Sequence, residues 1–254
     1  MEKIKANPQW ERYEEEIHTL IDKYNNKTLY WGNATYIGDA PQKVQDTQTP
    51  KPIAKALVEI LNRTNNNLYI SAAYLVPGKE GMKIFETLLA SGIEVQILTN
   101  SLASTDSLVV YGAWERYRNA LVKGGAQVYE YQYLGKGKSK LRDKISKSKA
   151  SLHSKSIVFD DTITWIGSFN LDPRSIYLNT ESVVIFDNPQ FAKALKADLI
   201  EDMEDAWKVY ENHGKTYWEG EHEGKIQTLS YPPDTSIWTR MLKALSKLLP
   251  ENQI

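Results

Sequence analysis

The chain has 254 residues, 41% of them hydrophobic and 25% charged, which is enough for one α/β core. Because 31 basic residues balance 32 acidic ones, overall charge favours neither nucleic acid nor membrane, and any such binding must be local. The absence of cysteine excludes thiolate catalysis, disulfides and cysteine-based zinc sites. The charged N-terminal segment lacks the apolar core of a signal peptide, and no run approaches the length of a membrane span. We expect a soluble, cytoplasmic protein, at most peripheral at the inner membrane.

The predicted elements begin with a helix and then alternate between helices and strands. Apolar residues at helical spacing predict a helix over 8–24, and a polar stretch with three prolines predicts a loop over 38–52. The elements that follow are a helix at 51–63, a strand at 68–76, a helix at 81–92, a strand at 93–100, a helix at 112–125 and a strand at 126–132. This alternation predicts an α/β fold, a mixed β-sheet flanked by helices on both faces.

Two stretches break the alternation. Residues 134–150 hold seven Lys or Arg against one Asp, so this loop is either a solvated segment or a clamp for the phosphates of lipid headgroups or nucleic acid. Residues 236–250 predict a basic amphipathic helix. That helix either docks on the core of the domain or lies in a membrane interface with Trp238 and its leucines in the lipid.

The segment SLHSKSIVFDDTITWIGSFN, residues 151–170, concentrates polar side chains around two apolar runs. His153 and Lys155 share one face of the first predicted strand, because side chains two apart point the same way. A turn at Asp160 leads into a second strand. If the two strands pair as a hairpin, the end of the second brings Ser168 and Asn170 beside the start of the first.

This arrangement suits chemistry on a phosphoryl group. A nucleophile or base candidate, His153, lies among hydrogen-bond donors that can hold the negative charge while phosphorus is attacked. Gly167 would let the backbone approach that group closely. A buried polar hairpin without catalysis is the alternative explanation.

The spacing His153-x-Lys155-x4-Asp160-x6-Gly167-Ser168-x-Asn170 resembles the complete signature of the phospholipase D superfamily. The segment LDPRSIYLNTESVVIF that follows resembles the bacterial cardiolipin synthases of that superfamily, as do ISAAYLVPGKEGM, ILTNSLASTD and the closing helix. The similarity runs from about residue 36 to the end and corresponds to the C-terminal half of such an enzyme. We expect a helical extension over 1–35, a phospholipase D-like domain over 36–210, and an extension over 211–254 that carries the basic helix.

The resemblance implies a role for each motif residue. His153 would attack the phosphodiester and form a phosphohistidine, while Lys155 and Asn170 hold the phosphate oxygens. Ser168 would lie in the same pocket. Glu181 is either the acidic residue that steadies the imidazole or an ordinary strand-edge carboxylate, and the position of Asp160 at a strand end suggests a structural role. This chemistry requires no metal and no cofactor.

The chain departs from the family in carrying one motif where family enzymes use two, the second His serving as general acid and then base. None of the other histidines, His18, His213 and His222, begins a second motif. We therefore expect either a homodimer that shares one site about a two-fold axis, which we favour, or a second chain that supplies the other motif.

These residues predict a phosphatidyltransferase, similar to cardiolipin synthase and active in phospholipid biosynthesis, that acts on anionic phospholipid at a membrane surface. A single-motif nuclease is the alternative within the superfamily, and Tyr129, Tyr131 and Tyr133 beside the basic loop are candidates for base stacking. Nucleic acid is nevertheless the less favoured partner. A half-enzyme without turnover, acting as a binding partner, is the alternative from another class.

Overall fold

The computed structural model describes residues 17–18, 21, 28–45, 51–132, 151–222 and 224–246. The helix predicted over 8–24 lies outside these residues except for three positions, which are helical. The basic run over 134–150 and Tyr133 also lie outside them.

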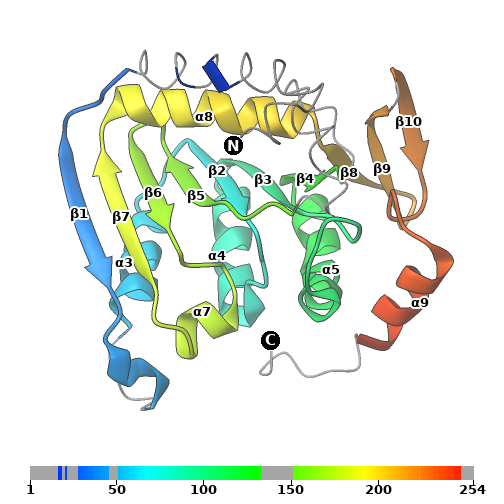
Figure 1. Ribbon diagram of the computed structural model, residues 1–254, viewed down its shortest axis with the longest axis horizontal. Coiled ribbons are helices and arrows are strands. Elements are labelled where there is room, and N and C mark those ends of the chain that lie inside the picture. The colour runs from blue at the N-terminus through cyan, green and yellow to red at the C-terminus, as the bar shows by residue number, and fades with distance from the viewer. Residues whose placement is uncertain are drawn as a thin grey trace, which may run out of the picture.

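The described residues form one ten-stranded sheet in the order β1-β7-β6-β5-β2-β3-β4-β8-β9-β10 (Figure 1). Its strands are β1 (Asn33–Gly38), β2 (Asn67–Ala72), β3 (Glu94–Asn100), β4 (Gln127–Tyr131), β5 (Lys155–Phe159), β6 (Ile163–Gly167), β7 (Ser182–Asp187), β8 (Trp207–Asn212), β9 (Lys215–His222) and β10 (Lys225–Leu229). β2 pairs with β3 and β3 with β4 in parallel, and the other neighbours pair antiparallel. The sheet is therefore mixed, as predicted.

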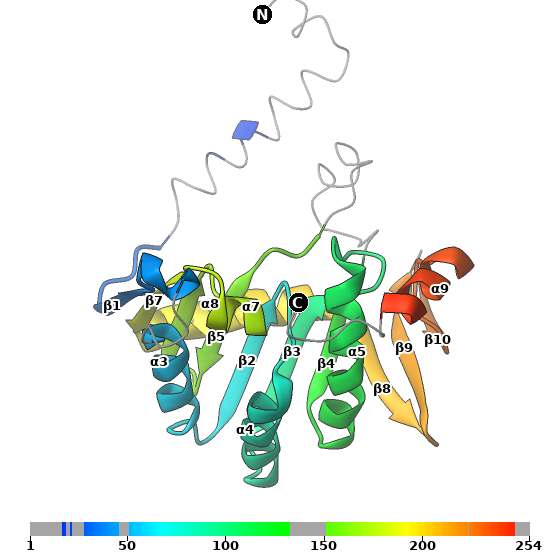
Figure 2. The ribbon, with the colours of Figure 1, turned by 90° about the horizontal axis from the view of Figure 1, so that it is seen from below.

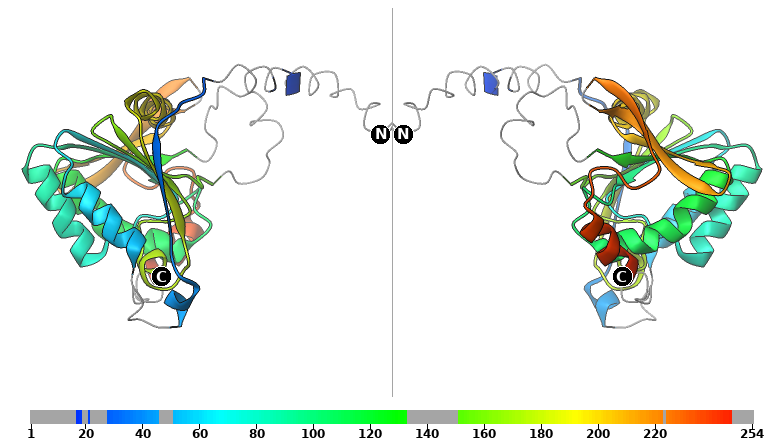
Figure 3. Two further views of the ribbon diagram at one scale, coloured as in Figure 1. Left: turned by 90° about the vertical axis from the view of Figure 1, so that its left-hand side faces the viewer. Right: turned by 90° about the vertical axis from the view of Figure 1, so that its right-hand side faces the viewer.

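Helices cover both faces of the sheet (Figures 2 and 3). One face carries α3 (Pro52–Leu61), α4 (Gly78–Ala90) and α5 (Leu108–Lys123), and the other carries α8 (Pro189–Glu204). The shorter elements are a 3-10 helix, η1 (Pro41–Val44), and the helices α7 (Pro173–Tyr177) and α9 (Ile237–Ser246). A large apolar core lies under α3–α5 and a smaller one under α8, which confirms the predicted fold class. In the part of the chain that is described, no helix is long and apolar enough to span a bilayer.

The chain leaves β2 earlier than predicted and turns toward the motif. The strand predicted over 68–76 ends at Ala72. Beyond it the N–H of Ala73 donates to the carbonyl of Ser154 at 2.9 Å, and the N–H of Val76 donates to the carbonyl of Leu171 at 2.7 Å. The segment after β2 therefore pairs with both ends of the motif instead of with β3.

A buried ion pair joins α5, β4 and β9. The Glu130 carboxylate, fully buried, accepts hydrogen bonds from Arg118 Nη1 at 3.0 Å and from Trp218 Nε1 at 2.7 Å. Tyr111 and Trp114 donate to the same carboxylate at 3.1 Å. Trp218 belongs to β9, so the segment expected as an extension over 211–254 adds strands to the same sheet and contributes to its buried network.

The closing helix α9 docks through its polar side. Lys243, buried, donates to both Glu115 carboxylate oxygens at 2.9 and 2.8 Å and so joins α9 to α5. Trp238 is 74% exposed, and the other large apolar side chains of this surface are also exposed: Ile237, Met241 and Leu242. The described part of α9 thus turns an apolar surface outward.

Candidate active site

β5 and β6 form the hairpin that the motif predicts. They pair antiparallel with Ser156 opposite Ile166, so that Lys155 and Gly167 are the next residues on the two strands. Three residues, 160–162, separate the last pair, Phe159 and Ile163. The turn uses positive φ angles of 51° at Asp160 and 55° at Asp161, and the Thr162 N–H donates to the Phe159 carbonyl at 3.0 Å. The hairpin therefore returns the Gly-Ser-x-Asn segment to the strand end that begins with Lys155.

Asp160 lies at the opposite end of the hairpin from His153. Its carboxylate accepts hydrogen bonds from three consecutive backbone N–H groups, those of Asn65 (2.9 Å), Asn66 (2.7 Å) and Asn67 (3.1 Å). These contacts tie the hairpin turn to the start of β2. Asp160 acts on the position of the hairpin and not on a ligand at the other end of it.

His153 and Lys155 lie together at the start of β5. Lys155 Nζ lies 3.5 Å from His153 Nε2 and donates to the His153 carbonyl at 3.2 Å. The imidazole is exposed and the ammonium half-buried. Burial lowers the Lys155 pKa, although the negative charges of Glu181, Asp172 and Asp106 act in the other direction. A cation that is partly desolvated and has acidic groups around it can bind a phosphate oxygen without first losing a full shell of water.

The packing of β6 against β7 requires a glycine at position 167, apart from any role toward a ligand. A Cβ at this position would lie 2.2 Å from the Ser182 carbonyl oxygen and 2.7 Å from Val183 Cα, which no side chain can do. The glycine is therefore required by the close approach of β6 and β7, which pair at Gly167 and Val183. Close approach of the backbone to a phosphate is not needed to explain it.

Glu181 binds hydroxyl groups and an amide. Its carboxylate accepts a short hydrogen bond from Ser168, one from Ser175 at 3.0 Å and one from Asn179 at 3.1 Å. Among the described residues it makes no hydrogen bond to His153, which differs from the expected contact with the imidazole. The physical reason is that the end of β6 and the helix α7 place Ser168 and Ser175 against the carboxylate, where they occupy its oxygens.

Asn170 and Asp172 lie on the segment between β6 and α7. The Asp172 carboxylate accepts the Ser175 N–H at 2.8 Å and so caps α7, and burial raises the pKa of this carboxyl. The Asn170 N–H donates to the Ser175 hydroxyl at 3.2 Å. Its side-chain oxygen is buried and, within the described residues, has no hydrogen-bond partner. This oxygen can accept a hydrogen bond from a donor, whereas only the amide nitrogen of Asn170 could donate to a phosphate oxygen.

Asn100 positions the chain just before His153, and the sequence analysis missed it. Buried at the end of β3, it donates to the Leu152 carbonyl and accepts from the Leu152 N–H, both at 2.9 Å, and it also donates to the Ala73 carbonyl at 3.0 Å. Because one side chain satisfies both backbone groups of Leu152, it fixes the segment that enters the site. A polar Asn at the end of an otherwise apolar strand could have indicated this positioning role in the sequence.

Asp39 and Lys43 form a second support that the sequence analysis missed. They make a buried ion pair, the Lys43 ammonium also donates to the Ser175 carbonyl at 2.7 Å, and an Asp39 carboxylate oxygen accepts the Glu181 N–H at 3.3 Å. The pair thereby connects α7 to the start of β7. It lies where only a loop was expected, and nothing in the local pattern marked it.

The other described histidines belong to other segments. His213 forms the tight turn between β8 and β9 with a φ of 49°, His222 ends β9, and His18 belongs to the N-terminal segment. Across the described parts of the chain, no group of three or more His, Asp or Glu side chains is placed to hold a metal ion.

Comparison with models of known protein families shows which family the chain belongs to. The model described as "Cardiolipin synthase, PLD-like domain" matches residues 57–203, which include the hairpin and Glu181. The chain belongs to the phospholipase D superfamily. In this superfamily member the matched region runs from α3 to α8 and contains the strands β2 to β7, which include the β5–β6 hairpin and both of its neighbours in the sheet.

Relatives of this phospholipase D-like chain are about twice as long. An uncharacterized protein of Helicobacter pylori is 43% identical over 247 residues, which are 96% of this chain and 48% of that protein. Cardiolipin synthase C of Escherichia coli is 31% identical over 239 residues, which are 92% of this chain and 50% of that enzyme. The chain thus spans about half the length of these curated relatives.

Solved structures share the fold at low sequence identity. Nuc from Salmonella typhimurium, a phospholipase D family member, aligns with a TM-score of 0.51 at 16% identity and covers 70% of this chain and 100% of that chain. A phosphatidylserine synthase of Haemophilus influenzae also gives a TM-score of 0.51, at 14% identity over 85% of this chain and 45% of that chain. These matches support the phospholipase D fold and leave the substrate open.

Proposed function

We propose that the chain supplies one half of a phosphatidyltransferase site that acts on phospholipid phosphodiesters. The observation that carries the proposal is the register of the β5–β6 hairpin, in which Lys155 and Gly167 follow the Ser156–Ile166 pair. In this register the exposed His153 and the side chain of Asn170, whose amide nitrogen is a donor, belong to the segments at one end of the hairpin. A nucleophile, a cation and an amide at one place suit attack on a phosphodiester.

In the proposed reaction a neutral His153 attacks phosphorus through a ring nitrogen. The N–P bond forms as the P–O bond to the leaving alkoxide breaks, while Lys155 and the amide of Asn170 hold the non-bridging oxygens. The alkoxide takes a proton from a general acid. An acceptor alcohol or water then loses its proton to the same group and attacks the phosphohistidine, which releases His153.

The general acid comes from a second motif. Within the described residues the other histidines, His18, His213 and His222, belong to segments other than the hairpin. The chain has one His-x-Lys motif followed by Gly-Ser-x-Asn. We propose that two copies pair about a two-fold axis and place both His153 side chains at one phosphate. A partner chain that carries the other motif is the alternative arrangement.

The proposed place of action is the surface of a membrane that contains anionic phospholipid. The outward apolar side of α9, with Trp238 and its neighbours, can enter the boundary between headgroups and acyl chains. For the nuclease alternative, Tyr129 and Tyr131 offer little support, since both pack against the core under α8. The relative at 31% identity is a cardiolipin synthase, which also favours lipid over nucleic acid.

Trapping of the covalent intermediate tests this function. The purified chain is mixed with phospholipid labelled in its phosphate, in the presence of EDTA, and then quenched with alkali. We expect label on the chain that is stable to alkali, labile to acid and absent in His153→Ala. Tyr36→Ala, a change of an exposed side chain on β1, serves as control and should keep the label.

Light scattering on the same sample tests the arrangement. A mass twice the 29.0 kDa of one chain, together with labelling, supports the shared homodimeric site. A labelled monomer would mean that the nucleophile works without a second copy. An unlabelled sample that instead hydrolyses single-stranded nucleic acid, and loses this activity in His153→Ala, would establish the nuclease alternative.

A further inference from the structure

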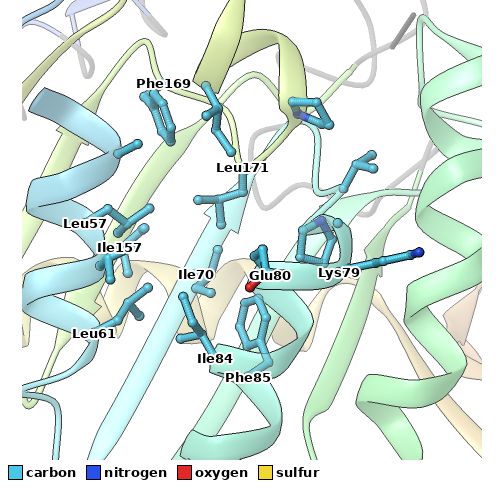
Figure 4. A pocket seen from close by; sticks show the side chains of 18 of the residues that line it. Leu57, Leu61, Ile70, Lys79, Glu80, Ile84, Phe85, Ile157, Phe169 and Leu171 are labelled. Carbon is cyan, nitrogen blue, oxygen red and sulfur yellow. The ribbon is translucent and has the colours of Figure 1, made fainter. Parts of the chain in front are cut away.

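An apolar cavity of about 350 Å³ lies between α3, α4 and α7, against the sheet (Figure 4). Leu57 and Leu61 of α3 form one wall, and Ile84 and Phe85 of α4 form the opposite wall. A cavity of this size is at the lower end of those that bind small ligands. None of its lining residues has a part in the proposed chemistry.

The lining fixes the chemistry of what the cavity can hold. Its deep part is made of buried apolar side chains, among them Ile70, Ile157 and Phe169. Its two charged side chains are at the rim, where Glu80 is largely exposed and paired with Lys83 at 2.9 Å. A polar ligand would lose its water and find no partner inside. The occupant must be a hydrocarbon.

The cavity and the site lie in line on one face of the sheet. Lys155 and Ile157 are alternate residues of β5, so their side chains point to the same face. The His153 ring lies beside Lys155, with 3.5 Å between Nε2 and Nζ. Ile157 lines the cavity. Residues two apart in a strand are about 7 Å apart. Ile157, on the cavity wall, therefore lies about 7 Å along β5 from Lys155.

The motif itself forms part of the wall. Phe169 stands between Ser168 and Asn170, and its ring lines the cavity and contacts Trp165 edge-on with 6.2 Å between ring centroids. Ile176 of α7 also lines the cavity, while its neighbour Ser175 donates to Glu181 at 3.0 Å. An occupant would therefore pack against the same residues that hold the site.

We propose that this cavity binds one acyl chain of the phospholipid substrate. The proposal rests on the proposed function, because it assumes that the reacting phosphate belongs to a lipid. A cavity in line with His153 would hold the lipid by its tail while the phosphodiester lies at the hairpin end. It would also make the enzyme select substrates by chain length.

Binding of cis-parinaric acid, a fluorescent fatty acid, tests the cavity without catalysis. We expect one molecule bound per chain, displaced by palmitic acid and not by hexanoic acid. Ala54→Phe, which fills the cavity from α3, should weaken binding by about tenfold or more. Lys55→Phe, at an exposed neighbouring position, should change it by less than about twofold, since it adds the same ring outside the cavity; tenfold is about 1.4 kcal/mol.

Ile84→Trp fills the cavity from the opposite wall and provides a second test in case Ala54→Phe does not fold. Circular dichroism checks that each variant is folded. His153→Ala should bind the probe as the wild type does. Absence of probe binding in the wild type, or equal binding in both folded filling variants, would overturn the acyl-chain site.

The dependence of the reaction on chain length then separates this proposal from the proposed function. Labelling by dioleoyl lipid should fall in Ala54→Phe by about tenfold, while labelling by dihexanoyl lipid changes little. If the probe binds in the cavity and no lipid labels the chain, the proposed function fails and the hydrocarbon site stands. If both lipids label the chain but the filling variants do not distinguish them, the proposed function stands and the acyl-chain site fails.

Discussion

Asn100 holds Leu152 by both of its backbone groups, with its side-chain amide donating to the carbonyl and accepting from the N–H at 2.9 Å each. Leu152 directly precedes His153, so a residue at the end of β3 sets where the proposed nucleophile enters the site. This relationship predicts that Asn100 affects activity without touching substrate.

Asn100→Ala should therefore lower the free energy of unfolding by about 2 kcal/mol or more, because it leaves buried backbone groups unpaired. The yield of phosphohistidine, measured well below the unfolding temperature, should also fall. Urea denaturation measures the first effect and labelling the second. Asn66→Ala, an exposed change, should stay within about 0.5 kcal/mol of the wild type. Full labelling by folded Asn100→Ala would show that Leu152 needs no such support.

Glu181 should act as a positioning residue. Glu181→Gln replaces one acceptor oxygen by a donor, which disturbs the bonds from Ser168 and Ser175. We expect kcat to fall by about tenfold or more with little change in KM, which corresponds to about 1.4 kcal/mol and to the loss of one charge-assisted hydrogen bond. Steady-state kinetics on vesicles measures both constants.

The matched control is Glu59→Gln, on the exposed side of α3, which should leave kcat unchanged. A Glu181→Gln variant that raises KM and keeps kcat would assign the carboxylate to substrate binding instead.

Lys155 should make stability depend on pH. Burial lowers its pKa, so between the folded-state pKa and the ordinary Lys value the unfolded chain binds more protons, and stability rises with pH in that window. Below the folded-state pKa the charged amine costs stability. Lys155→Met should therefore have a higher Tm than the wild type at pH 7.

The difference in Tm should shrink as pH rises through the lowered pKa of Lys155, because the native amine then loses its charge. Thermal unfolding at several pH values checks this, and labelling should be lost in the variant at all of them. A lower Tm for Lys155→Met at pH 7 would mean that the surrounding carboxylates outweigh burial.

Arg118 should be needed for stability because it neutralises the buried charge of Glu130. Arg118→Met leaves the Glu130 carboxylate buried with no compensating cation in the network, which should cost about 3–5 kcal/mol. The double variant Arg118→Met/Glu130→Gln should recover part of this loss, since position 130 then carries no charge that needs a cation. Chemical denaturation of the wild type, Arg118→Met, Glu130→Gln and the double variant measures the coupling.

Arg116→Met, exposed on the same helix, should change the free energy of unfolding by less than about 0.5 kcal/mol. If the double variant is as unstable as the sum of the single changes, the two side chains do not interact as described.

The fold class and the hairpin could be predicted because their signals are local. Alternating helical and strand patterns gave the mixed sheet, and the spacing from His153 to Asn170 gave a turn and two pairing strands. The fixed length of the hairpin then decides its register. The role of Gly167 could not be read from the same segment, because its neighbour is β7, which follows a separate helix.

The supports of the site depend on contacts between distant segments. Lys43 and Ser175 are 132 residues apart, and Asp39 and Glu181 are 142 apart. Such pairs follow from the strand order, in which β1 lies beside β7 and β5 beside β2, and local periodicity carries no information about that order. Whether α9 docks on the core or turns its apolar side outward was left open for the same reason, since it depends on where Glu115 meets Lys243.

The strand order also has a consequence for how the protein folds during synthesis. The parallel unit of β2, β3 and β4 with α4 and α5 can form as soon as it leaves the ribosome, because its contacts join neighbouring segments. β1 is synthesised before all of these, yet it has no strand to pair with until β7 appears. β1 is an open edge until then, and the free side of β2 is an open edge until β5 appears. Such edges invite wrong pairing between nascent chains. The residues around His153 are thus assembled in one of the last steps, so a chain that stops short of β7 would keep a folded parallel unit and have no site.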